Sequence, residues 1–326
     1  MIKDSSLQIG VIGVGHLGFF HLKQLSLINN INISGVYDID KKRLNEVSQL
    51  YGVTPFSSLE DLLLVSDAVT IVTPTPTHYN IAQLALNSGC HIFIEKPITN
   101  NILDAEKLLI SSKKLKKIIQ VGHIERFNPG FLALKQINPN PKFIEIHRLA
   151  PFNPRGNDVP VVLDLMIHDL DLIISLLGDK INNIKANGVK VVSSNIDIAN
   201  TRIEFQNGCI VNLTASRISQ KEMRKMRLFS SNSYITVDFK EKILEEYKIK
   251  KNISNLDKNK KILKIEENNE KFIVYNKPKI NQSDALKMEL VHFIDSIKNN
   301  ENPKTDGISA TQALNLALKI QTIIEN

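Results

Sequence analysis

Short apolar runs alternate with helix-like stretches along the first third of the chain. The apolar runs are continuous, without the polar alternation of a half-exposed strand, which is typical of parallel strands covered on both faces. The stretches between them have the spacing of surface helices. The expected strands are residues 7–12, 33–37, 68–73, 91–94 and 118–121, and the expected helices are residues 17–27, 40–51, 59–64, 79–88 and 102–113. This order predicts a doubly wound α/β domain over residues 1–123.

The rhythm changes after about residue 123. A long helix is expected over residues 161–177, and the strand-like stretches that follow it have no helices between them, which predicts a mainly antiparallel sheet. These stretches are residues 184–192, 196–205, 209–215, 226–230 and 234–239. The Lys-, Asn- and Glu-rich segment 250–271 predicts a polar hairpin or loop. Two amphipathic helices, the first capped by Ser283, close a second domain over residues 124–326.

The turn after the first strand has the sequence Gly13-Val14-Gly15-His16-Leu17-Gly18. Three glycines at this spacing are a weak signal alone, but they follow a strand and open a helix, and Asp38 comes 20 residues after Gly18. The first glycine allows a tight turn, the second lets a pyrophosphate approach the backbone, and the third allows close packing. Asp38 would accept hydrogen bonds from ribose hydroxyls and repel a 2′-phosphate. NAD is therefore the expected cofactor, although basic residues 41–43 leave NADP open.

Two more loops follow strands at the same expected sheet edge. Thr73-Pro74-Thr75-Pro76-Thr77-His78 is stiffened by its prolines, and its hydroxyls either bind ribose or phosphate or cap a rigid turn. Glu95-Lys96-Pro97 ends an apolar run. The carboxyl ends of the strands are where open α/β sheets bind ligands. We therefore expect Lys96 near the reactive end of the dinucleotide.

A third cluster, Asp164-Leu165-Met166-Ile167-His168-Asp169-Leu170-Asp171, lies in the helix expected over residues 161–177. α-Helical spacing places Asp164, His168 and Asp171 on one face. A carboxylate one turn from a histidine fixes its tautomer and stabilises its charged form. Oxidation of an alcohol needs such a base, and Lys96 would stabilise the developing alkoxide. The alternative interpretation is an exposed Asp–His–Asp face at a domain junction.

Composition narrows the class of protein. With 42% hydrophobic and 23% charged residues the chain is globular, and no apolar run reaches the roughly 18 residues of a membrane-spanning helix. We expect no secretory signal ahead of the first strand. The two cysteines form no framework or metal spacing, so we expect a cytoplasmic protein without a metal. The net charge is +7, but the basic residues are scattered, so we expect no nucleic acid or membrane partner. A basic surface also suits an anionic small substrate without identifying one.

In this order the motifs resemble those of the glucose–fructose oxidoreductase / inositol dehydrogenase / MocA family. The resemblance extends from Leu7 to Ile324 and is weakest between Lys240 and Tyr275. It implies a Rossmann domain followed by a domain with a large open antiparallel sheet, whose bare face commonly mediates homodimers or tetramers. It also implies a cofactor site that includes Glu95, Lys96 and Pro97, with a Lys96–Pro97 bond that is often cis.

The resemblance assigns roles to the remaining residues. Lys96 lies beside nicotinamide and substrate, His168 is the acid/base and Asp164 supports the substrate site. Segments 121–129, 147–151, 155–156 and 214–217 are similar to the branch that oxidises C3 of a UDP-linked N-acetylhexosamine before a 3-amino sugar is made for lipid A. That similarity assigns to the substrate Arg126, Asn128, Arg148, Arg155 and Arg217, whose arginine forks suit a diphosphate. Each arginine alone is also interpretable as a surface or structural residue.

One departure and two alternatives remain. Many family members have a Gly-Gly pair ahead of the histidine helix, whereas this chain has Asp158-Val159-Pro160, which is stiffer. The enzymatic alternative is a dehydrogenase of a free sugar, an inositol or a UDP-sugar uronate. The alternative of another class is a non-catalytic protein that senses NAD, although such a protein need not keep Lys96 and His168.

Overall fold

The computed structural model describes residues 6–153, 159–251, 261–265 and 271–326. The chain forms two compact units. Unit 1 comprises Met1–Ile124 and Asp284–Leu314, and unit 2 comprises Glu125–Ser283 and Asn315–Asn326. The division into domains 1–123 and 124–326 stays a prediction. The compact units differ from it in one respect, because Asp284–Leu314 belongs to unit 1.

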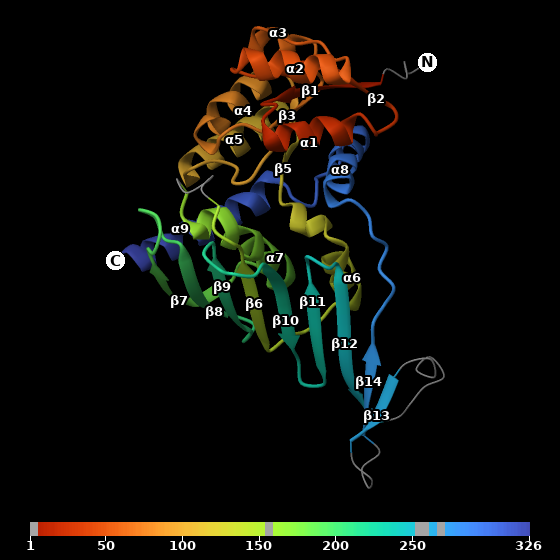
Figure 1. The fold of residues 1–326 in the computed structure, drawn as a ribbon, viewed down its shortest axis with the longest axis vertical. Coiled ribbons are helices and arrows are strands. Elements are labelled where there is room, and N and C mark those ends of the chain that lie inside the picture. The colour runs from red at the N-terminus through yellow and green to blue at the C-terminus, as the bar shows by residue number, and fades with distance from the viewer. Residues whose placement is uncertain (1–5, 154–158, 252–260, 266–270) are drawn as a thin grey trace. The chain divides into compact units, whose positions relative to one another are not determined.

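Unit 1 is built on a five-stranded parallel sheet (Figure 1). Its strands are β1 (Leu7–Ile12), β2 (Ile31–Tyr37), β3 (Ala68–Ile71), β4 (His91–Ile94) and β5 (Ile119–Val121), in the order β2-β1-β3-β4-β5. Its first helices are α1 (His16–Leu25), α2 (Lys41–Tyr51), α3 (Leu59–Leu64), η1 (Thr75–Thr77), α4 (His78–Asn87) and α5 (Ile102–Leu115). The predicted doubly wound sheet is confirmed. The strand order reverses between β1 and β3, which is where such sheets bind ligands.

Helix α8 (Ala285–Asn299) completes the core of unit 1 from the far end of the chain. Leu290 and Phe293 are fully buried, and the Phe293 ring lies 5.8 Å from that of Phe93 on β4. The prediction that Ser283 caps this helix is wrong. Asp284 occupies the N-cap position with an extended backbone, and its carboxylate accepts the bond from the Lys287 amide.

Unit 2 is built on a nine-stranded sheet in the order β13-β14-β12-β11-β10-β6-β9-β8-β7. The strands are β6 (Phe143–Leu149), β7 (Ile181–Val189), β8 (Ile198–Phe205), β9 (Ile210–Ser216), β10 (Met223–Phe229), β11 (Ser233–Asp238), β12 (Ile243–Lys250), β13 (Lys261–Lys264) and β14 (Phe272–Asn276). Among the described strands of unit 2, only the pairing of β6 with β9 is parallel. The predicted, mainly antiparallel sheet is therefore confirmed.

Helices cover one face of this sheet (Figure 1). They are η2 (Ile124–Phe127), α6 (Pro129–Ile137), the π-helical turn η3 (Val162–Met166) and α7 (Ile167–Leu177). Helix α9 (Gly307–Glu325) belongs to unit 1 up to Leu314 and to unit 2 beyond it. Among the described residues we find no helix that is both long and apolar enough to cross a bilayer.

Candidate active site

A cavity of about 560 Å³ lies at the carboxyl ends of β1, β2 and β3. It is lined by Gly13, Gly15, His16, Leu17, Tyr37, Asp38, Ile39, Asp40, Arg43, Val72, Thr73, Pro74, Thr77 and Ile81. The glycine turn, Asp38 and the threonine–proline loop therefore line one cavity. Thr75 and His78 are not among the lining residues.

The glycine turn has the geometry that its sequence demands. Gly13 has φ +86°, and a Cβ there would lie 2.6 Å from the Val72 carbonyl oxygen. A Cβ on Gly18 would collide with the Gly13 carbonyl oxygen. Helix α1 begins at Gly15 with no side-chain cap and no acidic residue in its first turn. Its first amide groups are thus suited to a pyrophosphate.

Asp38 is held in place by two backbone amides. Its Oδ2 accepts a bond from the Val14 amide at 2.8 Å, and its Oδ1 accepts one from the Asp40 amide at 2.9 Å. A carboxylate has about four acceptor positions, so two remain for other donors. Because the cavity offers a fixed carboxylate beside uncapped helix amides, it fits the ribose and pyrophosphate of NAD.

His78 joins two loops instead of facing the cavity. Its ring is 1% exposed; Nδ1 lies 2.9 Å from the Pro97 carbonyl oxygen and Nε2 lies 2.8 Å from that of Thr73. Burial lowers the pKa of His78 and outweighs the two carbonyl groups, which act to raise it. The neutral ring donates to only one carbonyl at a time. His78 therefore positions the Thr73 and Pro97 loops, which is a different role from the predicted contact with the cofactor.

The loop after β4 carries Lys96, and its Lys96–Pro97 peptide bond is cis, as the family resemblance implied. Lys96 is half-buried. Glu95 accepts a 2.9 Å contact from Nε2 of His21, a buried residue of α1. Burial acts to raise the pKa of Glu95, but His21 and Lys96 outweigh it and leave the pKa lowered. Sequence reasoning missed His21, and its signal was a histidine on the buried side of α1, three residues after Gly18.

In unit 2, the segment that carries Asp164 and His168 is not one continuous α-helix. Residues Val162–Met166 form a π-helical turn, in which the Ile167 amide bonds to the Val162 carbonyl oxygen, and α7 begins after it. Such turns recur at functional sites. Asp171, which is predicted to share one helix face with Asp164 and His168, is 1% exposed and pairs with Arg126, so its carboxylate bonds within unit 2.

Asp164 has an arginine neighbour. Nη2 of Arg217 lies 3.9 Å from Oδ2 of Asp164, and the same Nη2 donates to the Val159 carbonyl oxygen. The Arg217 side chain is 6% exposed and that of Asp164 is 39% exposed. The structure thus brings together two residues of the predicted substrate site, Asp164 in η3 and Arg217 at the end of β9, and His168 is the second residue of α7.

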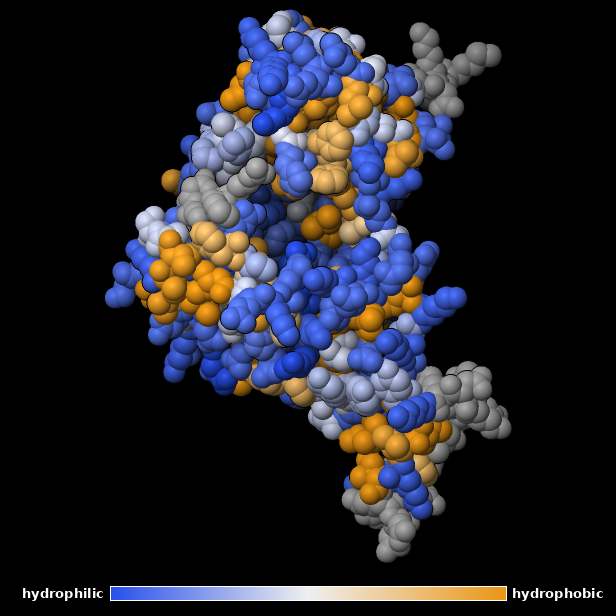
Figure 2. Space-filling view, in the orientation of Figure 1, coloured by the Kyte–Doolittle hydropathy of each residue, from blue (hydrophilic) through white to orange (hydrophobic). Residues whose placement is uncertain are grey.

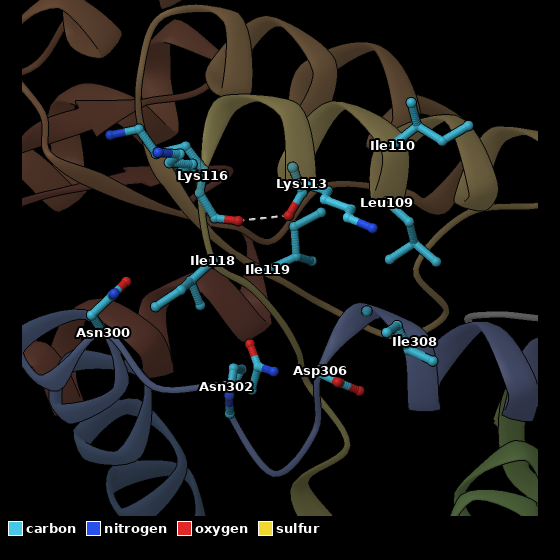
Figure 3. A pocket seen from close by; sticks show the side chains of 14 residues that line it. Leu109, Ile110, Lys113, Lys116, Ile118, Ile119, Asn300, Asn302, Asp306 and Ile308 are labelled. Carbon is cyan, nitrogen blue, oxygen red and sulfur yellow. Dashed lines mark hydrogen bonds between the residues drawn. The ribbon is translucent and has the colours of Figure 1, made fainter.

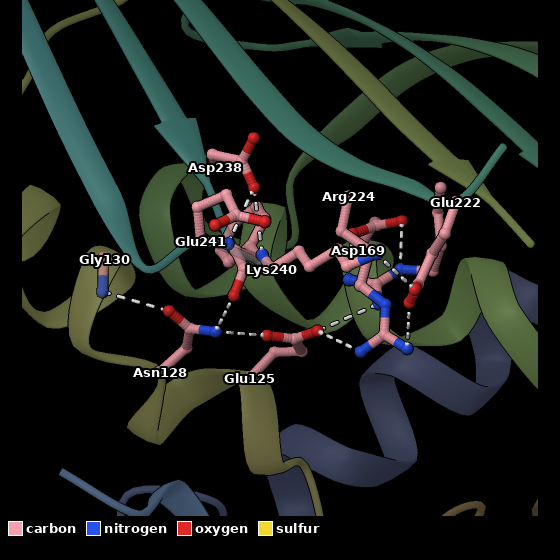
Figure 4. Close-up of polar contacts among 11 residues, drawn as sticks. Glu125, Asn128, Gly130, Asp169, Glu222, Arg224, Asp238, Lys240 and Glu241 are labelled. Atoms are coloured by element: carbon pink, nitrogen blue, oxygen red, sulfur yellow. Dashed lines mark hydrogen bonds and ion pairs between the residues drawn. The ribbon is translucent and has the colours of Figure 1, made fainter. Parts of the chain in front are cut away.

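The other predicted substrate residues among those described bond within unit 2; Figure 4 shows Asn128 with its partners Glu125 and Gly130. Arg148 donates to Asp169 and Glu125, and Arg126 donates to Asp171. Burial acts to lower the pKa of Arg148, but Asp169 and Glu125 raise it, so the guanidinium stays charged. Asn128 caps α6 and donates to Glu125 and to the Phe239 carbonyl oxygen. Arg155 lies outside the described residues.

A second cavity in unit 1, of about 640 Å³, lies at the amino end of β5 (Figure 3). Its wall includes Lys113 and Lys116 from the end of α5, Ile119 of β5, and Asn302 and Asp306 ahead of α9. This edge of the sheet is opposite to the carboxyl ends where the glycine turn and Lys96 lie. The second cavity is therefore separate from the cofactor site.

Comparisons with known proteins define the class. Residues 7–123 match the description "Oxidoreductase family, NAD-binding Rossmann fold", and residues 145–236 match the "GFO/IDH/MocA C-terminal domain". The chain is an NAD-dependent oxidoreductase, as the motifs predict. It belongs to the GFO/IDH/MocA family, so the family resemblance is confirmed.

Named relatives agree with this assignment. The chain is 39% identical to UDP-N-acetylglucosamine 3-dehydrogenase of Acidithiobacillus ferrooxidans over 74% of this chain and 77% of the relative. The solved structure of that dehydrogenase, GnnA, matches with a TM-score of 0.87 and 33% identity over 98% of both chains. The NAD-dependent scyllo-inositol 2-dehydrogenase of Bacillus subtilis is 30% identical over 66% of this chain and 69% of the relative.

Proposed function

We propose that this protein oxidises the C3 hydroxyl of a UDP-linked N-acetylhexosamine. The observation that carries the proposal is the similarity to UDP-N-acetylglucosamine 3-dehydrogenase, with 33% identity over 98% of the chain. The motifs for both halves of the reaction are present in this sequence, with Lys96 after β4 and His168 in α7. The predicted convergence of these two residues, which belong to different compact units, is part of the proposal.

NAD supplies a hydride acceptor when it is bound in unit 1. We propose that Asp38 holds its ribose hydroxyls and that the first amides of α1 hold its pyrophosphate. Thr73 and Pro74 contribute the neighbouring wall, and Glu95-Lys96-Pro97 lies at the nicotinamide end. The carboxylate of Asp38 disfavours a 2′-phosphate, so NAD is preferred to NADP.

Residues of this chain then remove the proton of the hydroxyl group and stabilise the charge that develops on its oxygen. His168 accepts the proton of the C3 hydroxyl, a contribution of typically 10²–10⁴-fold in rate. Lys96 places its ammonium against the same oxygen and stabilises the alkoxide character that develops there. Asp164, next to Arg217, orients the sugar. Arg126, Asn128, Arg148 and Arg217 all bond to carboxylates or carbonyls of unit 2, so the diphosphate is assigned to Arg155.

A substrate panel with the purified full chain tests the proposal. UDP-N-acetylglucosamine should reduce NAD, as measured by absorbance, and hydroxylamine should trap the ketone so that an unfavourable equilibrium does not hide turnover. UDP-N-acetylgalactosamine, UDP-glucuronate, free N-acetylglucosamine, glucose and myo-inositol form the panel. Faster turnover of a free sugar, an inositol or a uronate would replace the proposed substrate. Binding of NAD without oxidation of any panel member would favour the regulatory alternative.

Two variants test the assigned roles. Lys96→Ala should remove turnover with little effect on the Kd for NAD, because its ammonium acts on the substrate oxygen. His168→Gln should lower kcat by at least two orders of magnitude. Wild-type turnover in either variant would refute the role of that residue.

We also propose a homo-oligomer that forms through the open face of the unit 2 sheet. Five aromatic residues on neighbouring strands form a row there, with adjacent ring centroids 4.9–5.8 Å apart: Phe143, Phe229, Tyr234, Tyr247 and Tyr275. Hydrophobic residues, among them the exposed Leu263, gather at the end of the sheet with β13 and β14 (Figure 2). Tyr234→Lys/Tyr247→Lys should dissociate the oligomer in light scattering. An unchanged mass would contradict this interface.

The proposed cellular role is cytoplasmic. A 3-keto sugar nucleotide is the substrate of an aminotransferase that would supply a 3-amino sugar for lipid A. Deletion of the gene should replace amide-linked by ester-linked acyl chains at C3 in lipid A, as measured by mass spectrometry. Unchanged lipid A would contradict this role.

A further inference from the structure

Two buried arginine–aspartate pairs hold the helix that carries His168. Arg148 donates from Nε and Nη2 to the two oxygens of Asp169 at 2.9 and 2.8 Å. Arg126 donates from Nε and Nη2 to the two oxygens of Asp171 at 2.6 and 2.8 Å. Paired bonds of this kind fix both the distance and the plane of the two groups.

The two aspartates lie on either side of His168 around the axis of α7. Successive residues of an α-helix are separated by about 100° around its axis. Asp169 is therefore about 100° to one side of His168, and Asp171 is about 60° to the other side. Because both carboxylates are anchored, α7 cannot turn about its axis without breaking at least one pair.

The anchors come from neighbouring parts of unit 2. Arg148 belongs to β6, and its Nη1 donates to Glu125 of η2 at 2.9 Å. Arg126 is the next residue of the same short turn. Helix α7 is thus connected to η2 twice, once directly and once through the sheet.

Stability does not explain the charge at position 148. Along β6 the buried positions are Ile144, Ile146 and Arg148, so the arginine occupies a place where the strand otherwise has isoleucine. The side chains of Arg148, Asp169 and Glu125 are only 3–7% exposed. Apolar side chains of similar volume often replace such buried ions with no loss of stability. What the ions add is a defined geometry.

We propose that Arg126 and Arg148 are positioning residues that set the rotation of α7 and so the direction of the His168 ring. This inference rests on the proposed function, in which His168 accepts the hydroxyl proton. Displacement of a reacting group by about 1 Å can reduce a rate by about 100-fold. The two arginines therefore act through His168 and do not need to touch the substrate.

Arg148→Lys and Arg126→Lys keep the charge but lose the fork. Each should lower kcat about tenfold or more, with little change in the KM for the sugar nucleotide or in the Kd for NAD. The acid limb of the pH dependence of kcat/KM should also move, because it reports the ionisation of the base. An arginine that bound the diphosphate would instead raise KM, and that result would overturn the proposal.

The matched control is Arg227→Lys. Arg227 belongs to β10, beside β6, and pairs with Glu145 at 3.4 Å as an ion pair with both side chains about a third exposed. Its kinetics should equal those of the wild type. An equal loss of kcat in the control and in Arg148→Lys would show that the loss is not specific to the arginine–aspartate pairs, and would overturn the proposal.

The triple variant Arg148→Met/Asp169→Leu/Glu125→Gln separates geometry from stability, because it removes all three buried charges together. It should keep the wild-type melting temperature or exceed it, and still show the lower kcat and the shifted pH profile. Wild-type kinetics in the folded triple variant would overturn the proposal. If the triple variant does not fold, the two lysine variants decide.

A readout without turnover keeps this inference distinct from the proposed function. The NMR titration of the His168 ring, assigned by its loss in His168→Gln, should shift in Arg148→Lys and not in Arg227→Lys. An unchanged titration would overturn the proposed positioning role of the arginines, whether or not the enzyme is active. A wild-type protein that oxidises no panel member would overturn the proposed function alone.

Discussion

Nε2 of His21 lies 2.9 Å from Oε1 of Glu95, so the helix after the glycine turn is bonded to the residue that precedes Lys96. A Cβ on Gly122 would lie 2.8 Å from Oε2 of the same glutamate. The absence of a side chain at Gly122, just after β5, therefore makes room for the carboxylate. Three segments of unit 1 therefore meet at Glu95, and the contacts of Glu95 with the other two fix the position of the Glu95-Lys96-Pro97 loop.

His21→Ala should disturb Lys96 without touching it. The carboxylate of Glu95, whose side chain is 16% exposed, would lose the contact with His21. This loss should cost about 1–3 kcal/mol of unfolding free energy, and kcat should fall about tenfold. Denaturant unfolding and steady-state kinetics measure the two effects. Gln24→Ala, on the same helix, removes an exposed bond to Asp284 and is the control. A wild-type kcat in His21→Ala would contradict the link.

Asp38→Ala should weaken NAD binding at least tenfold and reduce the preference for NAD over NADP. The ribose hydroxyls lose a charged acceptor, and the charge that repels a 2′-phosphate is gone. Titration calorimetry with both cofactors measures the change. Asp67→Ala is a matched control, because Asp67 accepts the Gln8 amide at the amino end of β1, away from the cavity. Equal affinity losses in both variants would reject the assignment of Asp38.

His78→Ala should loosen two loops at once. Without its ring the Thr73 and Pro97 carbonyls lose their connection, so both the affinity for NAD and kcat should fall several-fold. His91→Ala is the control, because Nδ1 of His91 accepts the Ile118 amide at the opposite edge of the sheet. It should cost stability and leave the kinetics unchanged. The interpretation fails if the two variants behave alike in the kinetic assay.

His91 should make the protein less stable in mild acid. Burial, followed by Lys117, lowers the pKa of His91 to about 4. The unfolded chain binds a proton at this ring below about pH 6.5, whereas the folded chain does so only below about 4. The free energy of unfolding is therefore not reduced by His91 above pH 6.5, and it falls by about 2–3 kcal/mol as the pH drops to 4. In His91→Gln the free energy of unfolding, measured with denaturant at several pH values, should depend less on pH between 6.5 and 4 than in the wild type. The same pH dependence in both proteins would contradict the assignment.

The two thiols should be inert in the folded protein. Burial raises the pKa of Cys90 and of Cys209 to about 11, so few thiolates exist at mildly alkaline pH. Mass spectrometry after treatment with iodoacetamide should find neither residue alkylated. Both should react in concentrated guanidinium chloride, which is the positive control. Rapid alkylation of the native protein would contradict these burial effects.

The parallel sheet of unit 1 could be predicted from the sequence because its strands are uniformly apolar. Strands β1 and β4 match the predicted bounds to the residue, since every signal there agrees. Strand β6 was missed because Arg148 occupies the third of its buried positions, after Ile144 and Ile146. Arg148 fits a buried position only through Asp169 and Glu125, which are distant or unremarkable in the sequence. No local pattern reports such a partnership.

The candidate site divides in the same way. The glycine turn, Asp38 and Lys96 follow strands directly, so the strand ends predict their places. The roles of Arg126, Arg148 and Asn128 could not be predicted, because a fork that holds a helix and a fork that holds a diphosphate have the same sequence. The π-helical turn at Val162–Met166 was also unpredictable, since its hydrogen bonds span only one residue more than those of an α-helix.

Helix α8 is synthesised long after the first 124 residues of the nucleotide-binding unit. Leu290, Phe293 and Ile294 enter the core of unit 1 only after the ribosome has made the whole intervening sheet. A fragment that stops at residue 124 would leave the apolar surface around Phe93 exposed to water. A fragment cut at the apparent end of the Rossmann segment would thus be prone to aggregate. For the same reason we expect the nascent chain to bind chaperones until α8 has left the ribosome.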